Sequence, residues 1–186
     1  MNRATIGIFV GGASSRMGSP KGRLVYEGAP LLERMVASCG GLPCRLIGDA
    51  APYADLVPTV PRLADTVVGV GPIGGLDALL AEATTAYAVS VGCDMPFVTA
   101  ETLAALVHDP RDCPVLSARA DDDAPFEPML TRWSVSVMRD AVRAAITRGE
   151  YGLQKLIRAH DAERFVPEDA RAILDWDTPA DVLAKR

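Results

Sequence analysis

The sequence has little of what marks a nucleic-acid-binding, zinc-binding or membrane protein. Lys and Arg number 19 against 24 Asp and Glu, and the net charge of −5 makes neither nucleic acid nor an anionic membrane surface the expected partner. The two histidines and four cysteines form no CxxC pair and no ligand set with zinc-site spacing. An anionic substrate must therefore be bound by local cations rather than by the field of the whole protein.

Long hydrophobic runs are also missing from the N-terminal stretch MNRATIGIFVGG. It has one Arg and a short apolar run that ends in glycines, without the h-region of a signal peptide. The run is too short to span a bilayer. We expect a cytoplasmic protein whose cysteines stay reduced.

What the chain does have is the composition of a packed globular protein, with 49% hydrophobic and 23% charged residues. Its 186 residues suit a single domain, 1–186. Short apolar strands alternate with helical patterns through the first two-thirds of the chain, as at Cys44–Ile47, Tyr87–Val91 and Val115–Ala118. This alternation predicts βαβ units, a mostly parallel sheet and a three-layer α/β fold.

Proline and glycine mark several further boundaries. Residues 50–74 are rich in both and are predicted to form a long surface loop before a helix at Leu76–Ala83. Thr99 is a predicted N-cap, and Thr178-Pro179 is predicted to open a last helix. The predicted strand Phe126–Thr131 contains Pro128, so we expect an edge strand or a bulge there.

Ligands of such folds bind beyond the carboxyl ends of the strands. Gly11, Asp49, Asp94 and the acidic loop 119–125 each follow a predicted strand, and we expect them to gather at one edge of the sheet. Asp94 suits either a turn or a site, since a carboxylate at that edge could hold Mg²⁺ against phosphate oxygens.

The first loop, GGASSRMGSPK, combines two glycines with the cations Arg16 and Lys21. Glycines allow close approach of backbone N–H groups to an anion, and Arg and Lys neutralise its charge. The pattern GxxxxGK[ST] does not match, because five residues separate Gly12 from Gly18 and Lys21 does not follow Gly18 directly. A GxGxxG does occur in residues 69–74, but no strand leads into it.

This loop resembles the signature loop of the molybdenum cofactor guanylyltransferase (MobA-like) family of nucleotidyltransferases. Three more stretches agree with that family in order and spacing: residues 71–76 (GPIGGL), 92–97 (GCDMPF) and 175–181 (DWDTPAD). The resemblance covers essentially the whole chain. It implies a Rossmann-like nucleotidyltransferase fold that transfers GMP from GTP to molybdopterin, with Mg²⁺ as cofactor and pyrophosphate as leaving group.

The resemblance also assigns roles to individual residues. Catalytic roles fall on Arg16, Lys21 and Asp94, and metal binding falls on Asp94 and Asp177, with Asp175 as the alternative to Asp177. The implied nucleotide-binding residues are Phe9, Val10, Gly11, Gly12, Lys21, Asp49, Asp65, Gly71 and Asp94. For Asp49 and Asp65 a solvated loop position is the competing interpretation.

Pro20 departs from the guanylyltransferase pattern, which has Asp just before the loop Lys; Pro occurs there in many cytidylyltransferase relatives. A cytidylyltransferase or a sugar-1-phosphate nucleotidyltransferase therefore stays open, as does a non-catalytic nucleotide-binding protein. Contact with cofactor-delivering proteins or apo-molybdoenzymes is left open by the resemblance.

Overall fold

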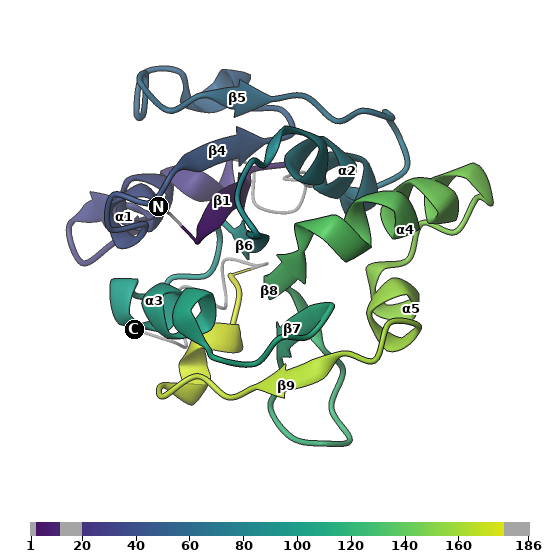
Figure 1. Cartoon of the computed structure of the whole chain (residues 1–186). Helices are drawn as coiled ribbons and strands as arrows, with labels where there is room; N and C mark the ends of the chain where they lie inside the picture. Colours follow the sequence, from purple (N-terminus) through teal and green to yellow (C-terminus); the bar gives the residue numbers. More distant parts are fainter. Residues whose placement is uncertain (1–2, 12–19, 177–186) are drawn as a thin grey trace.

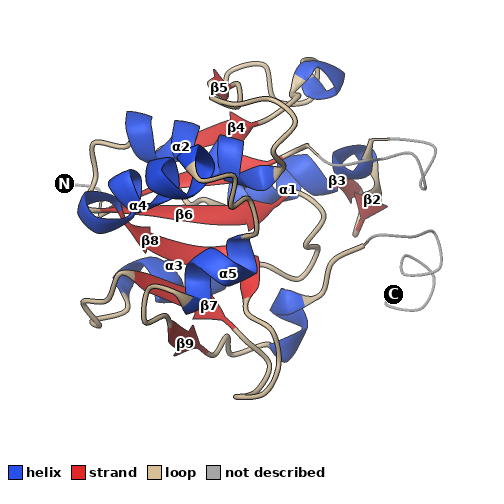
Figure 2. Cartoon of the chain, turned by 90° about the vertical axis from the view of Figure 1, so that its right-hand side faces the viewer, coloured by secondary structure: helices blue, strands red, loops and turns tan. Residues whose placement is uncertain are grey.

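The computed structural model describes residues 3–11 and 20–176, and these form one mixed sheet between two layers of helices (Figures 1 and 2). The sheet has the strand order β5-β4-β1-β6-β8-β7-β9. Only β8 runs antiparallel to its two neighbours. Its strands are β1 (Ala4–Phe9), β4 (Cys44–Ile47), β5 (Arg62–Leu63), β6 (Tyr87–Gly92), β7 (Val115–Ala118), β8 (Glu127–Ser134) and β9 (Glu163–Phe165). The predicted three-layer α/β fold with a mostly parallel sheet is confirmed.

Each face of the sheet has its own helices and its own core (Figure 1). The helices α1 (Leu31–Ser38) and α3 (Ala100–His108) cover one face, and α2 (Pro72–Glu82), α4 (Val135–Thr147) and α5 (Leu153–Arg158) cover the other. Alternation along β1 supplies both cores, since Ile6 and Ile8 pack with α1 and α3, whereas Phe9 packs with α2. Thr99 caps α3 by accepting a hydrogen bond from the Thr102 backbone N–H at 3.2 Å, as predicted.

Several short elements complete the described chain. They are the hairpin of β2 (Val25–Tyr26) and β3 (Ala29–Pro30), and the 3-10 helices η2 (Lys21–Arg23), η3 (Ala51–Tyr53) and η4 (Ala170–Ile173). Residues 50–74 are not loop throughout, because they contain η3, β5 and the first turn of α2. The helix predicted to begin at Leu76 begins at Pro72, where the fixed φ of proline suits the first helical position. The helix expected from Thr178 lies outside the described residues.

The strand that contains Pro128 is not at an edge. β8 lies between β6 and β7, so the edge alternative was wrong and the bulge is confirmed. Ser117 pairs with Thr131 and the adjacent Ala118 pairs with Glu127, which leaves three β8 residues without a partner on β7. Proline is tolerated inside the sheet because its missing N–H falls within this bulge.

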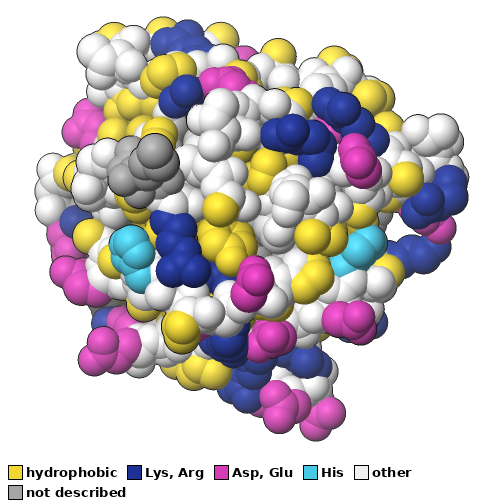
Figure 3. All heavy atoms as spheres, in the orientation of Figure 1, with side chains coloured by type: hydrophobic (Ala, Val, Ile, Leu, Met, Phe, Trp, Pro, Cys, Tyr) yellow, Lys and Arg dark blue, Asp and Glu magenta, His cyan; other side chains and the backbone are white. Residues whose placement is uncertain are grey.

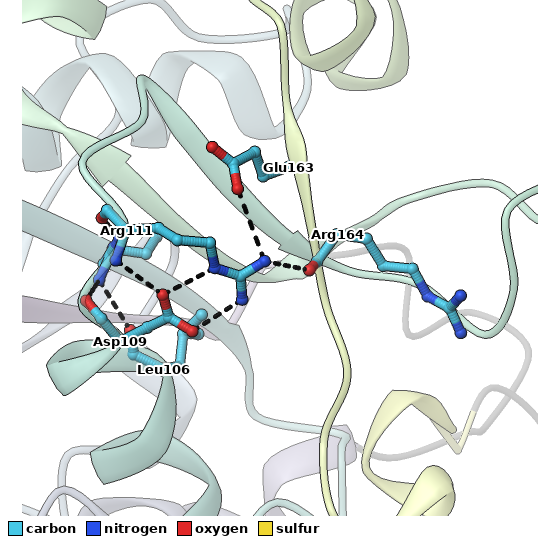
Figure 4. A network of polar contacts seen from close by, with 6 residues as sticks. Leu106, Asp109, Arg111, Glu163 and Arg164 are labelled. Carbon is cyan, nitrogen blue, oxygen red and sulfur yellow. Dashed lines mark hydrogen bonds and ion pairs between the residues drawn. The ribbon is translucent and has the colours of Figure 1, made fainter.

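A polar network fastens β9 to the segment that follows α3 (Figure 4). Arg111 pairs with Asp109 at 2.7 Å and with Glu163 at 3.6 Å, and it donates to the Arg164 carbonyl at 2.9 Å. The side-chain hydrogen bond and charge of Arg111 lower the pKa of Asp109 to about 2. This network is at the far side of the sheet from β4 and β5.

On the face drawn in Figure 3, Lys and Arg side chains are interspersed with Asp and Glu among hydrophobic groups. An anion that approaches this face meets individual cations rather than a broad positive field. Among the described helices, none is long and apolar enough to cross a membrane.

Candidate nucleotide-binding site

A cavity of about 420 Å³ lies where the parallel strands β4, β1 and β6 end. Such strand ends are the usual ligand position in open α/β sheets. The lining residues are Phe9, Val10, Gly11, Lys21, Ile47, Gly48, Asp49, Asp65, Gly71, Pro72, Gly92, Cys93, Asp94 and Met129. The sheet thus brings together residues that lie more than 100 positions apart in the sequence.

The first loop leaves β1 in close contact with the turn after β4. Val10 donates its backbone N–H to the Ile47 carbonyl at 3.0 Å, which extends the β1–β4 pairing to the cavity wall. Gly48 has φ +94°, and a Cβ there would lie 3.4 Å from the Gly11 backbone nitrogen. A side chain at position 48 would therefore be strained and would crowd the start of the loop.

The central contact of the cavity joins Lys21 and Asp94. Lys21 Nζ donates to Asp94 Oδ2 at 2.7 Å, and the two side chains are 17% and 20% exposed. Lys21 opens η2, and Asp94 follows β6 by two residues. At Gly92 a Cβ would come within 2.6 Å of Asp94 Oδ1, so the glycine leaves the space that the carboxylate occupies.

Buried neighbours hold Lys21 and Asp94 from behind. The Gly22 backbone N–H donates to the Tyr53 hydroxyl at 3.4 Å, and burial raises the pKa of Tyr53 to about 12. Burial also raises the pKa of the Cys93 thiol, with the Asp94 charge as the second cause. Tyr53 and Cys93 are therefore neutral near pH 7, and no thiolate is available at the cavity wall.

Asp65 is a carboxylate with no hydrogen-bond or ion-pair partner among the described residues. Burial raises the pKa of its carboxyl group above the usual value. It lies close to the turn after β4, because a Cβ on Gly48 would be 4.0 Å from Asp65 Oδ1. An acceptor that lacks partners in a cavity wall suits a ligand that brings hydrogen-bond donors.

The raised pKa gives a prediction for Asp65→Asn. A carboxyl group whose pKa is raised by folding contributes stability below its unfolded pKa and loses that contribution as pH rises through the folded pKa. We expect Asp65→Asn to raise the unfolding temperature at pH 7 and to leave it unchanged near pH 3. Thermal unfolding from pH 3 to 8 measures this, and an Asn variant less stable than the parent at pH 7 would contradict it.

Asp49 has a partly structural role. It is exposed, and its Oδ1 accepts the Ala51 backbone N–H at 3.1 Å at the start of η3. It nevertheless contributes to the cavity wall, as do Gly71 and Pro72 at the N-terminus of α2. The partial positive charge of a helix N-terminus is favourable to an anion placed there.

Eight of the predicted site residues line this one cavity: Phe9, Val10, Gly11, Lys21, Asp49, Asp65, Gly71 and Asp94. Gly12, Arg16 and Asp177 lie outside the described residues. The acidic loop 119–125 follows β7 but contributes no lining residue, and Arg164 pairs with its Asp122 at 3.1 Å.

The sequence interpretation missed Gly48, Gly92 and Met129 in the cavity wall. Met129 comes from the bulge in β8, and only the proline at position 128 marked that bulge in the sequence. The two glycines directly follow or end apolar strands, which was the available signal for a close backbone approach.

The donor set fits Mg²⁺, which takes oxygen ligands and is usually bound by one or two carboxylates together with substrate phosphates and water. Asp94 offers such a carboxylate in the cavity. No group of three or more His, Cys, Asp and Glu that could hold a metal ion occurs among the described residues. The ion would therefore take most of its ligands from the nucleotide and from water.

Comparison with known proteins decides the family. The model of the MobA-like NTP transferase domain matches residues 6–164, from β1 to β9. The chain belongs to this family. As a MobA-like nucleotidyltransferase it uses a cavity that its fold places at the ends of β1, β4 and β6.

Relatives of this MobA-like chain share most of its length. It is 33% identical to the molybdenum cofactor guanylyltransferase of Xanthomonas euvesicatoria pv. vesicatoria, over 92% of this chain and 88% of that protein. It is 29% identical to the probable molybdenum cofactor guanylyltransferase of Opitutus terrae, over 94% and 90%. The matched stretches therefore span nearly the whole of each protein.

Solved structures share the fold. Molybdopterin-guanine dinucleotide biosynthesis protein A from Archaeoglobus fulgidus superposes with a TM-score of 0.78 and 22% identity, covering 98% of this chain and 100% of that one. The 2-C-methyl-D-erythritol 4-phosphate cytidylyltransferase of Thermus thermophilus gives a TM-score of 0.69 at 13% identity, with coverage of 99% and 96%. The MobA-like fold therefore does not by itself decide which base is bound.

Proposed function

We propose that this nucleotidyltransferase is a molybdenum cofactor guanylyltransferase, which transfers GMP from GTP to molybdopterin. The observation that carries the proposal is the contact between Lys21 and Asp94 in a cavity at the ends of three parallel strands. A cation for phosphates and a carboxylate for a metal ion are the two groups that nucleotidyl transfer needs in one place. The guanylyltransferase names of its relatives support the choice of reaction.

Binding of the triphosphate is assigned to the first loop. Lys21 grips the phosphates together with Arg16, and the backbone amides of Gly11 and Gly12 lie on the same loop in the sequence. Asp94 and Asp177 would hold Mg²⁺, which would neutralise charge on the phosphates. The cavity wall at Phe9, Val10 and Gly71 contacts the nucleotide. In the absence of nucleotide, the ammonium of Lys21 instead neutralises the carboxylate of Asp94.

The reaction needs no general base from the protein. A phosphate monoester has its second pKa near 6, so the attacking phosphate of molybdopterin is largely a dianion near neutral pH. Its oxygen forms a bond to the α-phosphorus of GTP while the bond from that phosphorus to the bridging oxygen of the β-phosphate breaks, releasing pyrophosphate. No histidine lines the cavity among the described residues, and Cys93 is neutral there. Catalysis then rests on in-line positioning and on stabilisation of phosphate charge.

Asp65 supports guanine as the base. Its carboxylate has no partner among the described residues, and guanine presents two adjacent donors, N1–H and the 2-amino group, to such an acceptor. Asp49, on the neighbouring turn, offers a second acceptor oxygen. Cytosine presents only its 4-amino donors, which would leave more of these acceptors unpaired. The second candidate is a cytidylyltransferase, which Pro20 favours.

Thermal shift with each nucleotide tests the base. We expect GTP with Mg²⁺ to raise the unfolding temperature more than CTP, ATP or UTP, because a ligand at 100 times its Kd adds about 2.7 kcal/mol of stability. Pyrophosphate release with molybdopterin as acceptor then tests the transfer itself. If CTP stabilises the protein and GTP does not, the cytidylyltransferase replaces the present proposal. If no nucleotide binds, the nucleotidyl-transfer proposal is wrong.

The cellular setting of the reaction is part of the proposal. The four cysteines are free thiols, as suits the reducing cytoplasm in which we place the protein. Because molybdopterin is delivered to and removed from the enzyme, we propose transient contact with cofactor-delivering proteins or apo-molybdoenzymes.

A further inference from the structure

Three aromatic rings meet beside the cavity without lining it. The ring of Tyr26 lies 5.7 Å from that of Phe97 and 5.3 Å from that of Trp176, with interplanar angles of 76° and 82°. These are edge-to-face contacts, which fix the relative orientation of rings better than general apolar packing does. Phe97 is 5% exposed and Trp176 is fully buried. We call these three residues the aromatic cluster.

Each member of the aromatic cluster is tied to the Lys21–Asp94 contact by a short connection. Tyr26 follows Lys21 by five residues, across η2 and into β2. Phe97 follows Asp94 by three residues in the turn after β6. Trp176 donates its backbone N–H to the carbonyl of Asp94 at 2.9 Å. The cluster therefore joins the segment that carries Lys21 to the segment that carries Asp94 by a second route.

Arginines hold two of the rings from outside. Arg34 lies over the ring of Tyr26 at 4.9 Å and pairs with Glu27 at 2.9 Å, while Arg171 lies over Phe97 at 4.8 Å. These contacts come from α1 and η4 and restrict the rings further. The hydroxyl of Tyr26 makes no hydrogen bond to a described residue, so the contribution of Tyr26 comes from its ring.

We propose that the aromatic cluster positions the Asp94 carboxylate relative to Lys21, with Tyr26 as the ring that joins the two segments. This inference rests on the proposed function for its catalytic consequence. No member of the cluster lines the cavity, so each acts through Lys21 or Asp94. Both of these residues are in connecting segments, and a misplacement of about 1 Å can cost a factor of about 100 in rate.

Tyr26→Leu and Tyr26→Phe test the proposal against a purely structural role. The Leu variant keeps an apolar side chain but loses the ring, and the Phe variant keeps the ring. We expect Tyr26→Leu to lower kcat by roughly 10- to 100-fold and to raise the Mg²⁺ concentration for half-maximal rate. Tyr26→Phe should stay within about 2-fold of the parent. Tyr151→Leu, at an exposed tyrosine outside both cluster and cavity, is the matched control.

A double-mutant cycle in urea measures the same coupling without substrate. If the cluster positions Asp94, the destabilisations caused by Tyr26→Leu and Asp94→Asn are not additive; if Tyr26 only packs, they add. An additive cycle, or an unchanged kcat and Mg²⁺ dependence in a folded Tyr26→Leu protein, overturns the proposal. If the parent protein transfers no nucleotide, the proposed function has failed and the cycle alone decides whether the cluster positions Asp94.

Discussion

Asp94→Asn is expected to lower kcat by about 100- to 1,000-fold while the protein still folds. The substitution keeps the shape of the side chain and removes the negative charge that would hold Mg²⁺. The fold should survive because the Asp94 backbone carbonyl still accepts the Trp176 N–H, and the lost ion pair with Lys21 is only one partly exposed contact. Steady-state kinetics against Mg²⁺ concentration, with thermal unfolding for the fold, measure both expectations.

Asp122→Asn is the matched control for this substitution. Asp122 is 86% exposed, pairs with Arg164 and is absent from the cavity wall, so its loss should leave kcat unchanged. A folded Asp94→Asn protein that turns over within 3-fold of the parent and keeps its Mg²⁺ dependence would remove Asp94 from the mechanism.

Lys21→Met is expected to lower kcat/KM for the nucleotide by roughly 10- to 100-fold, which corresponds to about 1.4–2.7 kcal/mol of transition-state stabilisation. Met keeps much of the apolar stem and removes the ammonium that would grip the triphosphate. The variant should still depend on Mg²⁺, because Asp94 is retained, and this separates its behaviour from that of Asp94→Asn. Initial rates over a range of GTP and Mg²⁺ concentrations distinguish the two.

Lys155→Met provides the control for the loss of one positive charge. Lys155 is 71% exposed and pairs with Glu150 on α5, away from the cavity wall. It should leave kcat/KM unchanged. If both Lys variants behave alike, charge at Lys21 is not used in nucleotide binding.

The two substitutions also report on an exchange of partners. Lys21 Nζ is within 2.7 Å of Asp94 Oδ2 in the structure, and both groups are proposed to turn to new partners when nucleotide binds. An ion pair at a partly exposed position is weak enough to be replaced by phosphate and metal contacts. Lys21 is thus expected to serve two successive anions, the carboxylate of Asp94 and then the triphosphate.

The sequence by itself determined the fold class and most of the cavity wall. Apolar strands that alternate with helices leave one topology class, and in it glycines and carboxylates that follow strands come to one edge. Gly11, Asp49 and Asp94 could be placed in this way because each directly follows a strand. Asp65 and Gly71 came from resemblance to the family, because residues 50–74 have no hydrophobic period that would locate them.

Only the tertiary structure decided the contacts between segments that are distant in the sequence. The place of β8 inside the sheet depends on its pairing with both β6 and β7, so a single Pro128 could not distinguish an edge from a bulge. The contact of Lys21 with Asp94 spans 73 residues, and the aromatic cluster joins Tyr26 to Trp176. Local propensity and periodicity act over a few residues, whereas such pairs are selected by packing of the whole chain.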